Sequence, residues 1–119
     1  MAFRLQERAA GVGFDWPDAA GPLAKVKEET AELEQEMTAG DRAACARELG
    51  DLLFAVVNLA RKLGIDPRVA LEGANAKFMQ RFEQVERLAV ARGVELGRAT
   101  LAELDRLWDE VKAAQGQSL

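Results

Sequence analysis

Apolar residues recur along most of this chain every three or four positions, and short turns containing glycine, proline or aspartate separate the repeats. That spacing is the period of an amphipathic helix. It predicts a short helix at residues 3–11, long helices at 23–38, 42–63 and 67–91, and a last short helix after Thr100. No segment alternates apolar and polar residues as a half-buried strand would. The pattern therefore predicts an all-α fold.

Residues that favour helix ends mark the predicted boundaries: Pro22, Gly40, Asp41, Gly64, Asp66, Pro67, Gly93 and the pair Thr100 and Glu103. Pro22 is expected at the first position of its helix, where its missing N–H is not needed. The turns between the long helices are short, which favours antiparallel neighbours. We therefore expect an antiparallel helical bundle of three long and two short helices. Such a bundle is thin for its apolar content, so we expect homodimerisation to complete it.

Length and composition limit the number of domains and the classes of partner that the chain can have. A chain of 119 residues suits one domain, here residues 1–119. The net charge of −4 and the pI near 4.9 disfavour a nucleic-acid partner. The N-terminal residues resemble neither a signal peptide nor a membrane span, so we expect no membrane partner and a cytoplasmic location. Without histidine and with only Cys45, the usual zinc ligand sets are missing.

Pairs of acidic residues occupy two of the predicted long helices. Glu29 and Glu32 are three residues apart, and Glu48 and Asp51 repeat that spacing in the next helix, so each pair shares one helix face. The second pair lies in a mostly apolar helix, where neighbouring carboxylates are unfavourable without a cation or a proton. Oxygen ligands without histidine or thiolate suit Mg²⁺ or Mn²⁺. A solvated acidic helix face is the alternative interpretation.

The next predicted helix supplies the opposite charge. Lys77 and Arg81 are four residues apart, and Asn75 precedes them. Cations beside a metal-binding acidic cluster suggest a polyphosphate substrate whose charge is shared between metal and side chains. Trp16 and Trp108 are candidates for stacking on a nucleobase, although each is also a plausible core residue.

The acidic motif Glu28-Glu29-x-x-Glu32 followed by Glu48-x-x-Asp51 resembles the signature of the all-α nucleoside triphosphate pyrophosphohydrolases. Further stretches at 12–18, 48–61, 74–82 and 104–112 resemble the C-terminal catalytic domain of MazG proteins. The resemblance covers about residues 3–112. It implies Mg²⁺-dependent cleavage of nucleoside triphosphates between the α and β phosphates, giving the monophosphate and pyrophosphate, by a homodimer that removes non-standard nucleotides or lowers nucleotide pools.

The resemblance also implies roles for individual residues. The metal ligands would be Glu29, Glu32, Glu48 and Asp51, and the nucleotide and phosphate contacts would be Lys25, Glu28, Lys77, Arg81, Trp108 and Lys112. We add Asn75 to the substrate-binding candidates. The expected catalytic residues are Glu28, Glu29, Lys77 and Arg81, with Glu28 positioning the attacking water. Mn²⁺ is expected to substitute for Mg²⁺.

Two alternatives to this function stay open at the level of sequence. A narrower substrate, such as dUTP or a phosphoribosyl nucleotide, would keep the scaffold and the metal. A non-catalytic helical dimerisation module would need only solvated acids. MazG proteins commonly carry two such domains, so the chain is expected to be either a single-domain relative or an excised C-terminal domain.

Overall fold

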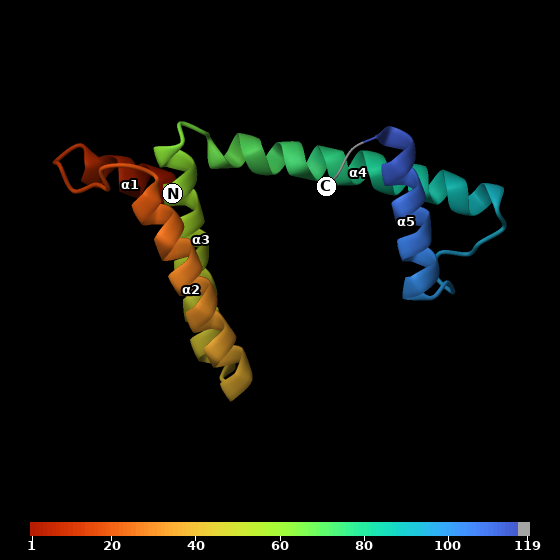
Figure 1. Cartoon of the computed structure of the whole chain (residues 1–119), viewed down its shortest axis with the longest axis horizontal. Helices are drawn as coiled ribbons and strands as arrows, with labels where there is room; N and C mark the ends of the chain where they lie inside the picture. Colours follow the sequence, from red (N-terminus) through yellow and green to blue (C-terminus); the bar gives the residue numbers. More distant parts are fainter. Residues whose placement is uncertain (117–119) are drawn as a thin grey trace. The chain divides into compact units, whose positions relative to one another are not determined.

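The computed structural model describes residues 1–116, and within that range all regular structure is helical (Figure 1). The helices are α1 (Ala2–Ala10), α2 (Ala20–Ala39), α3 (Arg42–Lys62), α4 (Pro67–Ala91) and α5 (Leu101–Gln115). The predicted all-α fold is confirmed. The chain divides into two compact units, residues 1–70 and residues from Leu71 onward, which are described separately below.

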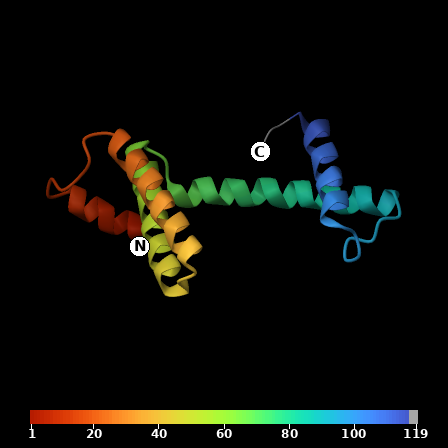
Figure 2. The same cartoon turned by 60° about the horizontal axis from the view of Figure 1, so that its bottom comes forward.

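Helices α2 and α3 form a hairpin in the first unit, and both views show them side by side (Figures 1 and 2). Gly40 ends α2 in the left-handed region at φ 74°, and its N–H donates to the carbonyl of Glu36 at 3.0 Å. The Asp41 side chain then accepts from the Ala44 N–H at 3.0 Å and caps α3. Gly40 adopts the left-handed conformation without steric cost because it has no Cβ, and Asp41 caps the next helix immediately. Together they give the short antiparallel turn that the sequence predicted.

The start of α2 differs from the prediction. The helix begins at Ala20 and not at residue 23, so Pro22 occupies its third position. The N–H groups of a helix's first turn have no acceptor within the helix, and proline is therefore tolerated throughout that turn. Asp18 supplies an earlier start signal, because its Oδ1 accepts from the Ala20 N–H at 2.9 Å.

The predicted starts of the later helices are confirmed. Asp66 Oδ1 accepts from the Arg68 N–H at 2.9 Å, and Pro67 takes the first position of α4. At α5 the Thr100 hydroxyl accepts from the Glu103 N–H at 3.2 Å. These contacts satisfy donors that the helices themselves leave without acceptors.

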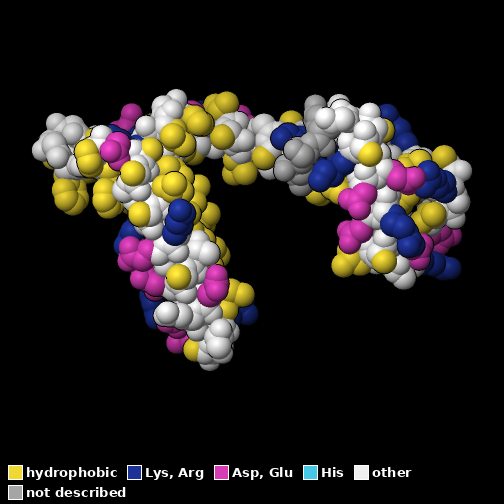
Figure 3. Space-filling model, viewed as in Figure 1, with side chains coloured by type: hydrophobic (Ala, Val, Ile, Leu, Met, Phe, Trp, Pro, Cys, Tyr) yellow, Lys and Arg dark blue, Asp and Glu magenta, His cyan; other side chains and the backbone are white. Residues whose placement is uncertain are grey.

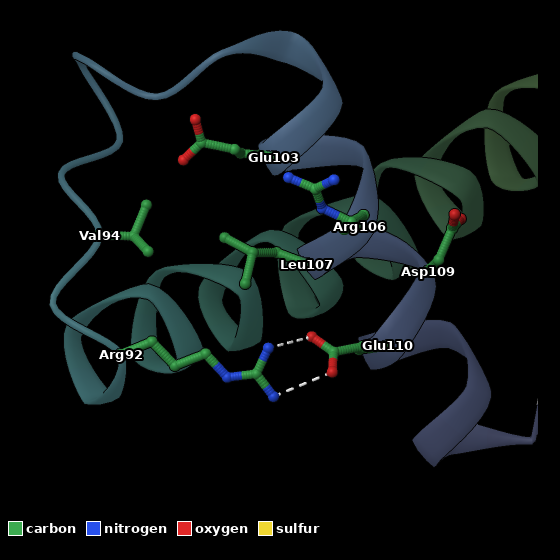
Figure 4. Close-up of a pocket in the computed structure, with 7 residues that line it drawn as sticks. All are labelled: Arg92, Val94, Glu103, Arg106, Leu107, Asp109 and Glu110. Carbon is green, nitrogen blue, oxygen red and sulfur yellow. Dashed lines mark hydrogen bonds and ion pairs between the residues drawn. The ribbon is translucent and has the colours of Figure 1, made fainter.

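In the second unit, α4 and α5 pack through a small core of Val85, Ala89, Leu107 and Val111. Arg92, the residue after α4, pairs with Glu110 of α5, with Nη2 and Oε1 2.9 Å apart (Figure 4). They line a cavity of about 470 Å³ together with Val94, Glu103, Arg106, Leu107 and Asp109. Because its charges have both signs and two of them are already paired, this cavity does not resemble a site for one highly charged ligand.

Several large apolar side chains of α3 stay exposed within the described chain: Leu49, Leu53, Phe54 and Val56. Of the two acids in this helix, Glu48 is half-buried and Asp51 is exposed. Figure 3 shows hydrophobic and acidic groups together on the segment formed by α2 and α3. None of the described helices is both long enough and apolar enough to cross a membrane.

Candidate functional site

The acidic residues of α2 and α3 converge across the hairpin. Glu29, Glu48 and Asp51 each place a carboxylate oxygen within 4.8 Å of the others, and Glu28, Glu29 and Glu32 form an overlapping group. The i, i+3 spacing on each helix and the antiparallel turn explain the arrangement, since each pair lies on the face that meets the neighbouring helix. Below, "acidic cluster" means Glu28, Glu29, Glu32, Glu48 and Asp51.

Two oxygens of this cluster are buried without a hydrogen-bond donor among residues 1–116. They are Oε2 of Glu29 and Oε2 of Glu48. Glu29 retains only 4% of its accessible surface, whereas Asp51 is exposed. Burying a carboxylate oxygen without a partner is unfavourable, and the usual remedies are a proton or a cation. The donor set therefore fits a hard divalent ion, which prefers carboxylate oxygens.

One cation of the chain already lies beside the cluster. Lys25 Nζ is 3.1 Å from Glu29 Oε1 and 3.4 Å from Glu28 Oε1. Hydrogen bonds to Glu29 and then to Glu28 raise the pKa of Lys25. The same lysine lowers the pKa of Glu29, so that carboxylate stays ionised. Lys25 and Glu29, four residues apart, therefore share one face of α2.

The pKa of Glu32 shifts in the opposite direction to that of Glu29. The Glu32 pKa rises to about 7 because the neighbouring carboxylates of Glu48 and then Glu29 favour the protonated form, which can donate a hydrogen bond to them, and burial adds to the effect. Three close carboxylates that cannot all be ionised comfortably will hold a proton until a cation replaces it. The acidic cluster is thus a place where a proton and a metal ion compete.

A cavity of about 340 Å³ opens beside the cluster. We call it the acidic cavity, and its lining residues are Trp16, Pro22, Lys25, Glu29, Asp51, Phe54, Ala55 and Asn58. All of them come from the first unit. The cavity combines carboxylates, one lysine and an aromatic wall, which is a composition suited to a metal-bound anion carrying an organic group.

The remaining predicted site residues belong to the second unit. Asn75 and Lys77 are exposed on α4, and Lys112 is half-buried on α5. Arg81 is completely buried, and its Nε donates to Gln115 Oε1 at 3.0 Å. The ring of Trp108 lies 5.4 Å from that of Phe78 and packs against the core of this unit. Their substrate contacts remain predictions.

Sequence reasoning missed a polar network beside the acidic cavity. Asp15 accepts hydrogen bonds from Arg61 and Lys62, and the Arg61 guanidinium lowers the pKa of Asp15 well below its ordinary range. Arg61 in turn donates to Asn58. Asp15 and Arg61 are 46 residues apart, and Asp15 lies in a loop without periodicity, so no sequence pattern connects them.

These observations define an all-α protein with a carboxylate cluster suited to a hard divalent cation. The family model described as the MazG nucleotide pyrophosphohydrolase domain matches residues 21–86, and the chain belongs to this family. The match contains all five residues of the acidic cluster.

Relatives with curated names agree with the family assignment. The chain is 44% identical over 113 residues to a nucleoside triphosphate pyrophosphohydrolase of Escherichia coli K12, a match covering 93% of this chain. It is 43% identical over 112 residues, 94% of the chain, to the nucleoside triphosphate pyrophosphohydrolase/pyrophosphatase MazG of Thermotoga maritima. The Bacillus subtilis protein YabN, described as uncharacterized, is 45% identical over 71 residues, or 60% of this chain and 14% of YabN. The chain spans 43% of the length of the first two relatives.

Proposed function

We propose that this chain hydrolyses nucleoside triphosphates between the α and β phosphates, producing the nucleoside monophosphate and pyrophosphate. The observation that carries the proposal is the pair of buried, partnerless oxygens of Glu29 and Glu48 within a cluster from two helices. Family membership supports the reaction class, because two relatives are named as nucleoside triphosphate pyrophosphohydrolases.

In this proposal Glu29, Glu32, Glu48 and Asp51 hold Mg²⁺, with Mn²⁺ as a substitute. When bound, the ion would neutralise phosphate oxygens and polarise the attacking water. Glu32, whose pKa is raised to about 7 by Glu48 and Glu29, would lose its proton when the ion binds. Carboxylate oxygens from two helices favour Mg²⁺ over softer metals.

The other charged residues act on the substrate. Lys25, which lies beside Glu28 and Glu29 and lines the acidic cavity, would contact a phosphate oxygen. Glu28 is exposed next to Glu29 and would accept a hydrogen bond from the attacking water. Lys77 and Arg81 would stabilise negative charge on the departing pyrophosphate. Asn75, Trp108 and Lys112 would complete the nucleotide contacts.

We further propose that two copies of the chain associate through α3. Leu49, Leu53, Phe54 and Val56 are between 42% and 58% exposed, and the spacing of Leu49, Leu53 and Val56 puts these three on one face of α3. Surfaces of this kind usually mark an interface. A symmetric dimer would cover it with the same surface of a second copy. A cytoplasmic location stays a prediction from the sequence.

The test is pyrophosphate release from a panel of ribo- and deoxynucleoside triphosphates with Mg²⁺, comparing the parent with Asp51→Asn. This substitution removes a metal ligand but keeps the size and position of an exposed side chain. We expect Mg²⁺-dependent release by the parent and a loss of about 100-fold or more in the variant, because even residues that only support metal ligands typically contribute about 10–100-fold. Selective cleavage of dUTP alone would favour the narrower substrate. No cleavage, together with no Mg²⁺-induced rise in the melting temperature, would refute the proposal and favour a non-catalytic dimerisation module.

A further inference from the structure

The wall of the acidic cavity combines carboxylates with a few groups that can donate a hydrogen bond to an anion. Side-chain N–H donors on this wall come from Trp16, Lys25 and Asn58. The ammonium group of Lys25 is already paired with Glu28 and Glu29. The orientation of the Asn58 amide therefore matters, because only its NH₂ end can donate to an anion.

The amide of Asn58 is held by Arg61, one turn further along α3. Arg61 Nε lies 3.2 Å from Asn58 Oδ1, and Arg61 Nη2 lies 2.7 Å from the same oxygen. A guanidinium group has donors and no acceptor, so it binds an amide through the amide oxygen. The NH₂ group of Asn58 is consequently on the side of the amide that faces away from Arg61.

Arg61 is fixed in turn by a carboxylate from the loop before α2. Asp15 accepts from both terminal nitrogens of the guanidinium, from Nη1 at 3.1 Å and also from Nη2. Lys62 Nζ and the backbone N–H of Trp16 donate to the same carboxylate, at 3.2 Å and 2.8 Å. The side chains of Arg61 and Asp15 retain 13% and 20% of their accessible surface. A two-point ion pair that is largely shielded from water gives the guanidinium one preferred position.

The arrangement is more elaborate than a tie between the loop and α3 requires. The ion pair of Asp15 with Arg61 and Lys62 is sufficient for that purpose. The remaining edge of the guanidinium instead binds Asn58, a half-buried residue that lines the acidic cavity. Asn58 also lies seven residues after Asp51, two turns along the same face of α3.

We propose that Asn58 is a further substrate-binding residue, whose NH₂ group donates to a phosphate oxygen of the triphosphate, and that Arg61 and Asp15 are positioning residues for its amide. A neutral donor suits this place, because it stabilises a phosphate oxygen without repelling a divalent ion held by the neighbouring carboxylates. This inference rests on the proposed function and adds one binding residue and two positioning residues to it.

The test is equilibrium dialysis of inorganic tripolyphosphate with Mg²⁺ against the parent, Asn58→Leu, Arg61→Lys and the double variant. Tripolyphosphate has neither base nor sugar, so it reports phosphate contacts alone, and none of these substitutions changes the net charge. Loss of one hydrogen bond to a charged group weakens binding by about tenfold. We expect that loss for Asn58→Leu. We expect a smaller loss for Arg61→Lys, because one ammonium group cannot bind Asp15 and Asn58 as the guanidinium fork does.

The double variant distinguishes positioning from a general effect on the fold. If Arg61 acts on the ligand only through Asn58, Arg61→Lys weakens binding no further once Asn58 is replaced. Losses that multiply in the double variant would overturn the inference. Affinity equal to that of the parent in either single variant, or no binding of tripolyphosphate by the parent, would also overturn it.

Arg42→Lys is the matched control for Arg61→Lys. Arg42 is exposed at the other end of α3, about 28 Å from Arg61 along the helix. We expect this variant to bind tripolyphosphate as the parent does. Melting temperatures show whether each variant folds. If Asn58→Leu does not fold, Asn58→Asp replaces it, because a carboxylate keeps an acceptor for Arg61 but lacks the donor, and the same loss of affinity is expected.

Steady-state kinetics separate failure of this inference from failure of the proposed function. With nucleoside triphosphates, Asn58→Leu and Arg61→Lys should raise KM with little change in kcat, since the contact is present before the reaction as well as during it. Turnover with an unchanged KM in both variants would overturn the inference and leave the proposed function intact. Absence of turnover, with tripolyphosphate binding weakened as expected, would refute the proposed function and support the phosphate contact.

Discussion

The contact between Trp16 and Gly21 allows a quantitative prediction of how Gly21→Ala changes the stability of the folded chain. Replacing Gly21 by alanine would place a Cβ 2.3 Å from Trp16 Cε3 and 2.8 Å from Cζ3. Carbon atoms in good contact are about 3.5–4.0 Å apart, so the indole would have to move by roughly 1 Å. Such overpacking costs about 1–3 kcal/mol. Alanine returns about 0.5–1 kcal/mol through its better helix propensity. We expect a net loss of about 0.5–2 kcal/mol in the free energy of unfolding.

Urea denaturation followed by circular dichroism measures this change. Gly73→Ala is the matched control, because Gly73 lies inside α4 with nothing within 4 Å of its added Cβ. We expect that variant to gain about 0.5–1 kcal/mol, since only helix propensity acts. If Gly21→Ala were stabilised as much as Gly73→Ala, the reasoning about the Trp16 contact would be wrong.

Two further predictions concern charge and association. Asp15→Asn should lower the melting temperature at neutral pH. Because Arg61 lowers the pKa of Asp15 in the folded state, the stabilisation is present above the unfolded pKa of about 3.8 and disappears as the pH falls toward the lower folded value. The difference between parent and variant should therefore narrow below about pH 4, and a difference independent of pH would contradict this account. Leu53→Glu places a charge on the exposed apolar surface of α3. It should convert a dimer into a monomer in sedimentation velocity, and an unchanged dimer would exclude this surface as the interface.

The sequence predicted a helix boundary correctly where the residue there strongly prefers one position at a helix end. Gly40 and Asp41 end one helix and start the next as expected, because a left-handed conformation and an N-cap each have strong residue preferences. Pro22 was misplaced by two positions because proline is compatible with the whole first turn. Asp18, two residues before the helix, was the better signal.

The acidic cluster was predictable from spacing, but its surroundings were not. Glu29, Glu32, Glu48 and Asp51 lie on the faces that helical periodicity assigns to them, and the short turn forces those faces together. Which of these acids is buried depends on what covers α3, and periodicity does not contain that information. Arg61 donates to both Asn58 and Asp15, and its contact with Asp15, a loop residue 46 positions away, exists only in the folded chain.

The position of Lys25 affects how the acidic cluster would exchange one cation for another. Its ammonium group lies beside Glu28 and Glu29 and so acts as an internal counterion. A divalent ion bound by Glu29 would compete with the lysine for the same carboxylate, and the lysine would then be free to turn toward an anion. Binding of the metal would therefore release the ammonium group of Lys25 from Glu29, and the released ammonium group could then bind a phosphate.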